Sequence, residues 1–264
     1  MIDTVYTENF SMDYCCFGSG SRNFVIIPGL STGPITPMEE AIAAQYAIFT
    51  DEFTVYLFDR RNELPDNYSM ETMAEDTVAA IKQLGLTDIC LYGSSQGGMI
   101  AQLMAETHPD LIEKLIIASS AATCNDTGKS IIDNWIDIAK TGDGVALNAA
   151  MIDKVYSPAF IEKYKDLMEA CKAPMTEAAL KRFITLAGSV LTFHHIDDLS
   201  KICCDVFVIG CEGDQIFTHQ PTLDMAKKLG CNCHIYGPEY GHAAYDEAPD
   251  CVGRVFEFVN TLHL

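Results

Sequence analysis

Short, almost wholly apolar runs recur along the chain, separated by longer segments whose apolar residues have the spacing of amphipathic helices. Such runs are typical of strands buried on both faces, and their alternation with helices predicts a parallel sheet covered on both sides. The predicted strands of this kind are NFVIIPG, FTVYLFD, DICLYGS, EKLIIAS, DVFVIGCEGD and CNCHIYG. Ahead of them, DTVYTENF and MDYCCFG are predicted to form a β-hairpin or meander.

The alternation of strands and helices stops after Ala121 and resumes near Val206. Between these points the apolar spacing is helical throughout and predicts no buried strand. Four helices are predicted there, in the segments SIIDNWIDIAKTG, GVALNAAMIDKVY, AFIEKYKDLMEACK and EAALKRFITLAGSVLTF. The sequence therefore predicts an α/β core domain split into residues 1–121 and 198–264, with a helical cap, residues 122–197, inserted in it.

The charge of the chain limits the partners it can have. Its 264 residues include 37 acidic and 17 basic side chains, and the formal net charge is −20. Because phosphate groups are bound by clustered lysine and arginine, this balance argues against nucleic acid and against an anionic membrane surface. No run approaches the roughly 20 apolar residues that a membrane-spanning helix needs. The segment MIDTVYTENF also lacks the basic and apolar regions of a secretory signal.

Cysteine usage indicates a reducing compartment. The 11 cysteines are an odd number, and several lie inside predicted strands, among them Cys90, Cys204 and Cys211. Free thiols in a cytoplasmic protein explain this better than a disulfide framework. The CNC and CC segments lack the paired spacing and matching partners of a zinc site, so no metal site is expected.

The segment LYGSSQGGM places two serines between a predicted strand and a predicted helix. Ser95 has a glycine two residues before it and another two residues after it, which forms a G-x-S-x-G frame. Ser94 has tyrosine and glutamine at the corresponding places. A serine on such a sharp strand-to-helix turn projects its hydroxyl above the carboxyl edge of a parallel sheet, where ligands bind. Ser95 is therefore the candidate nucleophile.

A serine nucleophile needs a base to remove its proton, and the base needs an acid to hold its orientation. Asp214 comes directly after one buried strand, and His242 lies in the loop after the next, so both are expected at the same sheet edge as Ser95. The competing candidates for the base are His108, His194, His195, His219, His234 and His263, and those for the acid are Glu212 and Asp246. Loop position favours His242 and Asp214.

Acyl transfer also needs hydrogen-bond donors for the negatively charged oxygen that develops during the reaction. One expected donor is the backbone N–H of Gln96, which follows the nucleophile at the positive end of its helix. The second is expected in the loop after FVIIPG, where Gly29 lets the chain turn and the N–H of Leu30 is best placed.

The stretches VIIPGLSTG, YLFDRR, LYGSSQGGMIAQLMA, VIGCEGD and YGHAAYDEAP resemble those of the α/β-hydrolase superfamily, in particular its cap-bearing, carboxylesterase-like members. The resemblance covers essentially the whole chain. It implies the α/β-hydrolase fold, with a mostly parallel eight-stranded sheet and a helical lid, and no metal or organic cofactor. It also implies the triad Ser95, Asp214 and His242, with oxyanion donors at Leu30 and Gln96. Two departures are Pro-Gly where many relatives have His-Gly, and DRRN where DRRG or similar is common.

We expect a cytoplasmic serine hydrolase that cleaves a small carboxylic ester through an acyl-enzyme on Ser95. Two alternatives are other chemistry on the same triad (thioester or C–C bond hydrolysis, acyl transfer, lyase chemistry) and a slow-turnover receptor for a small ligand. The expected cap carries many large apolar residues, including Trp135 and Phe193. Together with the net charge, they predict a small-molecule substrate that is uncharged and partly apolar.

Overall fold

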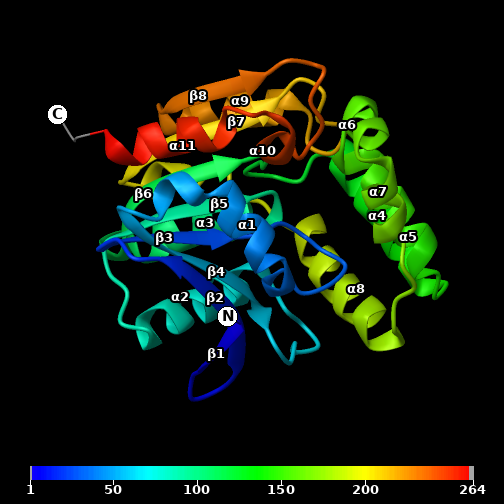
Figure 1. The fold of residues 1–264 in the computed structure, drawn as a ribbon, viewed down its shortest axis with the longest axis horizontal. Helices are drawn as coiled ribbons and strands as arrows, with labels where there is room; N and C mark the ends of the chain where they lie inside the picture. The colour runs from blue at the N-terminus through cyan, green and yellow to red at the C-terminus, as the bar shows by residue number, and fades with distance from the viewer. Residues whose placement is uncertain (1, 262–264) are drawn as a thin grey trace.

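One mixed sheet forms the centre of the computed structural model, which describes residues 2–261. Its eight strands have the order β1-β2-β4-β3-β5-β6-β7-β8. The β1–β2 and β2–β4 pairs are antiparallel, and the other neighbouring pairs are parallel. The strands are β1 (Ile2–Tyr6), β2 (Ser11–Gly18), β3 (Arg22–Ile27), β4 (Phe53–Arg61), β5 (Ile89–Ser94), β6 (Ile112–Ala118), β7 (Asp205–Cys211) and β8 (Asn232–Tyr236). The predicted eight-stranded, mostly parallel sheet is confirmed (Figure 1).

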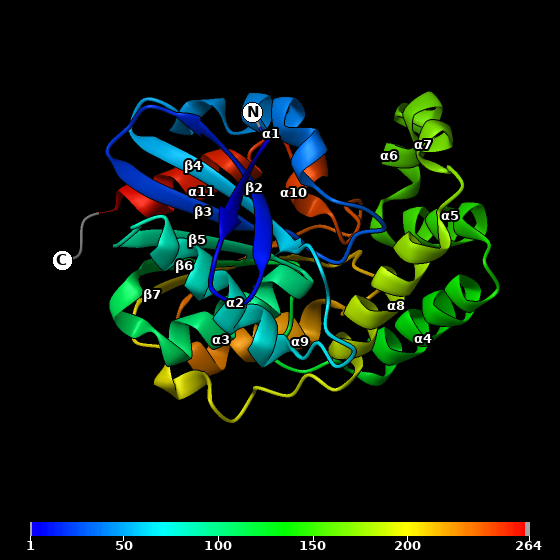
Figure 2. The same ribbon diagram turned by 90° about the horizontal axis from the view of Figure 1, so that it is seen from below.

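Helices cover both faces of this sheet (Figure 2). One face is covered by α2 (Met70–Gln83), α3 (Gln96–Thr107) and α9 (His219–Leu229), and the other by α1 (Glu39–Gln45), α10 (Ala244–Glu247) and α11 (Cys251–Asn260). Single 3-10 turns lie at Thr36–Met38, Ala47–Phe49, Pro109–Leu111 and Leu199–Lys201. Because the central strands are buried between two helical layers, their sequences are apolar on both faces.

Five helices connect β6 to β7 and lie beyond the carboxyl ends of the parallel strands (Figure 1). They are α4 (Asp126–Lys140), α5 (Gly144–Val155), α6 (Pro158–Lys163), α7 (Lys165–Cys171) and α8 (Glu177–Leu191). The segment AFIEKYKDLMEACK, predicted as one helix, forms both α6 and α7, because Tyr164 between them has non-helical angles (φ −113°, ψ 33°). Apolar spacing continues through this one-residue break, so the pattern does not predict it.

The two ends of the inserted segment are hydrogen-bonded to each other. The N–H of His195 donates to the carbonyl of Ala122 at 2.7 Å, and the N–H of Cys124 donates to that of Phe193 at 3.3 Å. The chain therefore leaves the sheet layer and returns to it at adjacent points, which is the geometry of an insertion. The domain boundaries drawn from the sequence stay a prediction.

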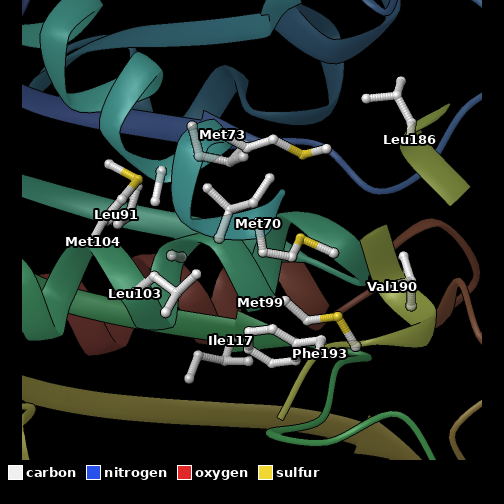
Figure 3. Packing of buried hydrophobic residues seen from close by; sticks show 14 of the residues in the cluster. Met70, Met73, Leu91, Met99, Leu103, Met104, Ile117, Leu186, Val190 and Phe193 are labelled. Atoms are coloured by element: carbon white, nitrogen blue, oxygen red, sulfur yellow. The ribbon is translucent and has the colours of Figure 1, made fainter. Parts of the chain in front are cut away.

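The hydrophobic core on one face of the sheet continues into the inserted helices. Figure 3 shows Met99 of α3 in the same cluster as Leu186 and Val190 of α8 and the nearby Phe193. All four side chains are buried. Burial of an apolar side chain of this size stabilises a fold by about 1.5–3 kcal/mol. Helix α8 is therefore packed firmly against the core.

Helix α3 begins in close contact with the end of β3. A Cβ atom at Gly97 would overlap the carbonyl oxygen of Ile27 and would lie 2.6 Å from that of Pro28. A Cβ atom at Gly93 would lie 2.8 Å from the Cα of Gly98. Both glycines are thus required by close backbone packing, and they allow the turn between β5 and α3 to be sharp.

This packing predicts that Gly97→Ala destabilises the protein by about 3 kcal/mol, because the added methyl group cannot fit without moving two backbone segments. Urea unfolding at equilibrium would measure the change in the free energy of unfolding. The matched control is Gly188→Ala in α8, where a Cβ atom would meet nothing within 4 Å. That variant should be more stable than the wild type by about 0.5–1 kcal/mol, since alanine is the better helix former. Equal stabilities for the two variants would contradict the packing argument.

Candidate active site

Ser95 occupies the turn between β5 and α3 and has a positive φ of 51°. This conformation costs a non-glycine residue about 1–3 kcal/mol and persists only when its surroundings hold it. Hydrogen bonds do so: among them, the Ser95 N–H donates to the carbonyl of Ala118, and the Ser95 carbonyl accepts from the Ser120 hydroxyl and the Gly98 N–H. The distances are 2.9, 2.7 and 3.0 Å, respectively. The strained turn is therefore anchored to the end of the adjacent strand β6.

Asp214 and His242 form a buried pair at the same edge of the sheet. Asp214 follows β7 and His242 follows β8, and Oδ2 of the carboxylate lies 2.7 Å from Nδ1 of the imidazole. Oδ1 accepts hydrogen bonds from the N–H groups of Ile216 and Phe217 at 2.7 and 3.1 Å. An ionised carboxylate can only accept hydrogen bonds, so the short contact places the imidazole proton on Nδ1.

The second nitrogen of His242, Nε2, is buried and has no hydrogen-bond partner within residues 2–261. A buried nitrogen without a partner is unusual, because its desolvation is not compensated. His242 and Ser95 line the same cavity. With its proton on Nδ1, the imidazole can use Nε2 to accept a proton from a group in that cavity.

The expected oxyanion donors border this cavity as well. Leu30 and Gln96 both line it, and Gln96 is the first residue of α3. The N–H groups of a helix's first turn have no acceptor within the helix, and they lie at its positive end. The loop that carries Leu30 approaches the serine closely, since a Cβ atom at Gly29 would lie 3.0 Å from the Cβ of Ser95. The structure thus brings Leu30 and Gln96 to the candidate nucleophile from two different elements.

The cavity has a volume of about 50 Å³, and its walls come from both the sheet edge and the inserted helices. The inserted helices contribute apolar side chains, which are Ile132, Trp135, Met151, Val155 and Val190. The core contributes Gly29, Leu30, Ser95, Gln96, Ile216, Phe217, His242 and Tyr245. The site is therefore a small, mostly apolar chamber with a few polar groups at one wall, as is usual for small-molecule sites.

Sequence reasoning missed two residues of α10, the short helix that follows the loop of His242. Tyr245 lines the cavity, and burial raises the pKa of its phenol above the ordinary value, so the group stays a hydrogen-bond donor. Glu247 Oε1 accepts from the N–H of Gly241 at 3.1 Å and from the N–H of Ser157 at 2.9 Å. It thereby joins the loop of His242 to the turn before α6. Both residues lie in the YGHAAYDEAP stretch, but no motif or spacing in it assigns either of them a role in the site.

The competing candidates lie elsewhere. Asp246 accepts hydrogen bonds from Tyr156 and Gln45, and Glu212 does not line the cavity that holds Ser95. The histidines that lie within residues 2–261 but do not line that cavity are His108, His194, His195, His219 and His234. His263 lies outside the described residues. Of the candidates considered from the sequence, Asp214 and His242 are the pair that the fold brings together.

All 11 cysteines are free thiols. Burial raises the pKa of the Cys211 thiol, close to Asp214, to about 12, so this thiol stays protonated at neutral pH. Within residues 2–261 no group of three or more histidine, cysteine, aspartate or glutamate side chains is placed to hold a metal ion. In the same part of the chain, no helix is both long enough and apolar enough to cross a membrane.

Comparisons with known proteins agree on the family to which the chain is similar. The family model described as "alpha/beta hydrolase fold" matches residues 23–249. A curated relative, 3-oxoadipate enol-lactonase 2 of Acinetobacter baylyi, is 21% identical over 221 residues, which are 82% of this chain and 80% of the relative.

Two solved structures share the fold over almost their whole length. The α/β-hydrolase enzyme MGS-M2, from a Medee basin deep-sea metagenome library, has a TM-score of 0.88 and 23% identity, covering 99% of this chain and 98% of the other. An esterase of Exiguobacterium antarcticum has a TM-score of 0.81 and 20% identity, covering 99% of this chain and 100% of the other. The family match spans most of the chain, and the sheet order and the serine turn are described above. The protein therefore belongs to the α/β-hydrolase family and is an enzyme, a hydrolase.

Proposed function

We propose that the protein is a serine hydrolase that cleaves a small carboxylic ester or lactone through an acyl-enzyme on Ser95. The observation that carries the proposal is the buried 2.7 Å pair of Asp214 and His242, whose free Nε2 belongs to a residue lining the same cavity as Ser95. The named activities of relatives, an enol-lactonase and an esterase, support this class of substrate. A lactone is an intramolecular ester, so both substrates need the same chemistry.

In the proposed mechanism, His242 Nε2 takes the proton of the Ser95 hydroxyl as its oxygen attacks the carbonyl carbon. The N–H groups of Leu30 and Gln96 donate hydrogen bonds to the oxyanion that forms. The C–O bond then breaks, and His242 gives its proton to the leaving alkoxide. Water attacks the acyl-enzyme in a second round of the same steps, which releases the carboxylic acid and restores Ser95. Asp214 keeps the Nδ1 proton in place and stabilises the imidazolium that forms in each round.

The inserted helices act in this proposal as a lid, residues 122–197, that excludes water and sets the substrate range. Support comes from the apolar side chains that these helices contribute to the cavity. The net charge of −20 and the apolar walls favour an uncharged, partly apolar substrate. We also propose a cytoplasmic location, which the 11 free thiols support.

The first prediction from the proposed function separates the two adjacent serines. Ser95→Ala should lower ester turnover by about 10⁴-fold or more, because no hydroxyl remains to form the acyl-enzyme. Ser94→Ala should keep most of the activity. Labelling with a fluorophosphonate, located by mass spectrometry of the digested protein, should find Ser95 modified in the wild type and in Ser94→Ala. Modification of Ser94 in place of Ser95 would show that the nucleophile is wrongly assigned.

The second prediction concerns the acid. Asp214→Asn should lower kcat by about 10⁴-fold with little change in the free energy of unfolding, because an amide can hold the imidazole in the wrong tautomer. The matched control is Asp246→Asn in α10, four residues after His242. Its carboxylate contacts Tyr156 and Gln45. Its kcat should stay within about threefold of the wild type. A silent Asp214→Asn beside a severe Asp246→Asn would mean that Asp246 is the acid.

The third prediction concerns chain length. Along a series of acyl esters, kcat/KM should rise with each added methylene until the cavity is full. Each methylene should stabilise the bound transition state by up to about 0.8 kcal/mol. Trp135→Ala should move the optimum to longer acyl chains, because Trp135 lines the cavity. Phe193→Ala is the matched control, since Phe193 is buried but does not line this cavity among the described residues. An unchanged optimum in Trp135→Ala, or a preference for anionic esters, would contradict the proposed lid.

A further inference from the structure

A buried arginine lies behind the two expected oxyanion donors. Arg60, near the end of β4, is 5% exposed. Its Nη2 donates to the carbonyl of Pro28 at 2.7 Å and is 3.3 Å from Oε1 of Gln96. Arg60, Gly29 and residues of α8 together line a small cavity of about 10 Å³. A single donor group therefore contacts both walls of the expected oxyanion hole.

These contacts are placed where they can fix the two N–H donors. The Pro28 carbonyl belongs to the peptide that precedes Gly29, one residue before Leu30, so its hydrogen bond restrains the rotation of the loop that carries the Leu30 N–H. The contact with the Gln96 side chain restrains the first residue of α3, whose own N–H is the other donor. Arginine suits this task because its planar guanidinium presents several donors in a rigid geometry.

The side chain of Gln96 extends the same network to the cap. Its Nε2 donates to the carbonyl of Leu186 at 2.7 Å and to the hydroxyl of Ser189 at 3.3 Å, both in α8. Arg182, also in α8, donates to the carbonyl of Arg60 at 3.2 Å and to that of Arg61 at 2.9 Å. Helix α8 is thus hydrogen-bonded to both Arg60 and Gln96.

The charge on Arg60 is not neutralised by a direct ion pair with its neighbour Asp59. That carboxylate instead accepts from the N–H groups of Ile35 and Thr36 and from the Thr36 hydroxyl. Burial lowers the pKa of Arg60 to about 10, which leaves the side chain protonated at neutral pH. Burial of a cation is costly, and an apolar residue of similar size would often stabilise a fold more. A role in the candidate active site would explain why a charged arginine, and not an apolar residue, is buried at position 60.

We propose that Arg60 is a positioning residue for the oxyanion hole, and that the Gln96 side chain couples the position of α8 to it. The inference rests on the proposed function, because it assumes that the Leu30 and Gln96 N–H groups bind an oxyanion. Arg60 touches no substrate in this scheme. It acts by holding the Pro28 carbonyl and the Gln96 side chain, so its loss should weaken transition-state binding more than substrate binding.

The experiment compares Arg60→Met, Arg60→Lys and Gln96→Met with the wild type. For each protein, kcat and KM are measured on an activated short-chain ester. The second-order rate constant for modification of Ser95 by a fluorophosphonate is measured as well, because the phosphoryl oxygen of this reagent also needs the oxyanion hole. Arg60→Met should lower kcat and the labelling rate by about 10²-fold, the effect of losing one oxyanion donor, with KM within about threefold. Arg60→Lys should recover part of both rates. Gln96→Met should lower both by about 10-fold.

Arg22→Met is the matched control. Arg22 is the first residue of β3 and so lies at the amino ends of the parallel strands, away from the candidate site. It also donates to a backbone carbonyl, that of Val259 at 2.8 Å, and to the side chain of Asn260 at 2.6 Å. Its loss should lower stability without changing either rate per folded molecule, with the folded fraction measured by circular dichroism. Equal losses of rate in Arg22→Met and Arg60→Met would overturn the inference, as would a folded Arg60→Met with both rates within about threefold of the wild type. If Arg60→Met does not fold, Gln96→Met decides by the same criterion.

The labelling rate separates this inference from the proposed function. If the wild type is labelled on Ser95 but hydrolyses no ester or lactone, the proposed ester hydrolysis is wrong, and the labelling rates of the variants still decide the role of Arg60. If the wild type is not labelled at Ser95, both proposals are refuted. If Arg60→Met raises KM while kcat and the labelling rate stay unchanged, Arg60 shapes substrate binding and not the oxyanion hole.

Discussion

The contact between the start of α3 and the end of β3 governs the geometry of the whole site. Gly97 lies against the carbonyls of Ile27 and Pro28 so closely that no side chain fits between them. This approach forces a sharp turn at Ser95, whose positive φ is held by hydrogen bonds to the end of β6. It also brings the first N–H groups of α3 beside the loop that carries Leu30. A helix starting a few ångströms farther away would separate Ser95 and the Gln96 N–H from the loop that carries Leu30, the second expected donor.

The rest of the site depends on parallel strands that end at one edge. Because β5, β7 and β8 run in the same direction, the loops after them converge, and Ser95, Asp214 and His242 meet although they are far apart in sequence. The Asp214 carboxylate uses one oxygen for the loop backbone and the other for the imidazole. The carboxylate is therefore held in place before any substrate binds, which is the preorganisation that the proposed acyl transfer needs.

Polar contacts join the inserted helices to this edge on both sides of the site. On one side, Gln96 bonds to α8 through Leu186 and Ser189. On the other, the N–H of Ala243 donates to the carbonyl of Val155 at 3.0 Å, and Glu247 contacts both Gly241 and Ser157. Displacement of these helices would therefore disturb the loop of His242 and the start of α3 together. Substrate range and catalytic geometry are linked by these contacts in the proposed enzyme.

The sequence alone determined the sheet, the presence of the inserted helices and the order of the candidate site residues. Those features depend on local patterns: apolar runs for β3 to β8, the glycines around Ser95, and the loop positions of Asp214 and His242. Other features depend on contacts between residues distant in the chain, and only the tertiary structure decided them. The break at Tyr164 left the apolar spacing unchanged. Tyr245, Glu247 and Arg60 lie in stretches that resemble the family, but no pattern in the sequence assigns them a role. Folding places Tyr245 against the cavity, Glu247 against the turn before α6, and Arg60 against the Pro28 carbonyl. Only the tertiary structure decides such contacts, because a side chain's partners are set by packing in space and not by its neighbours in sequence.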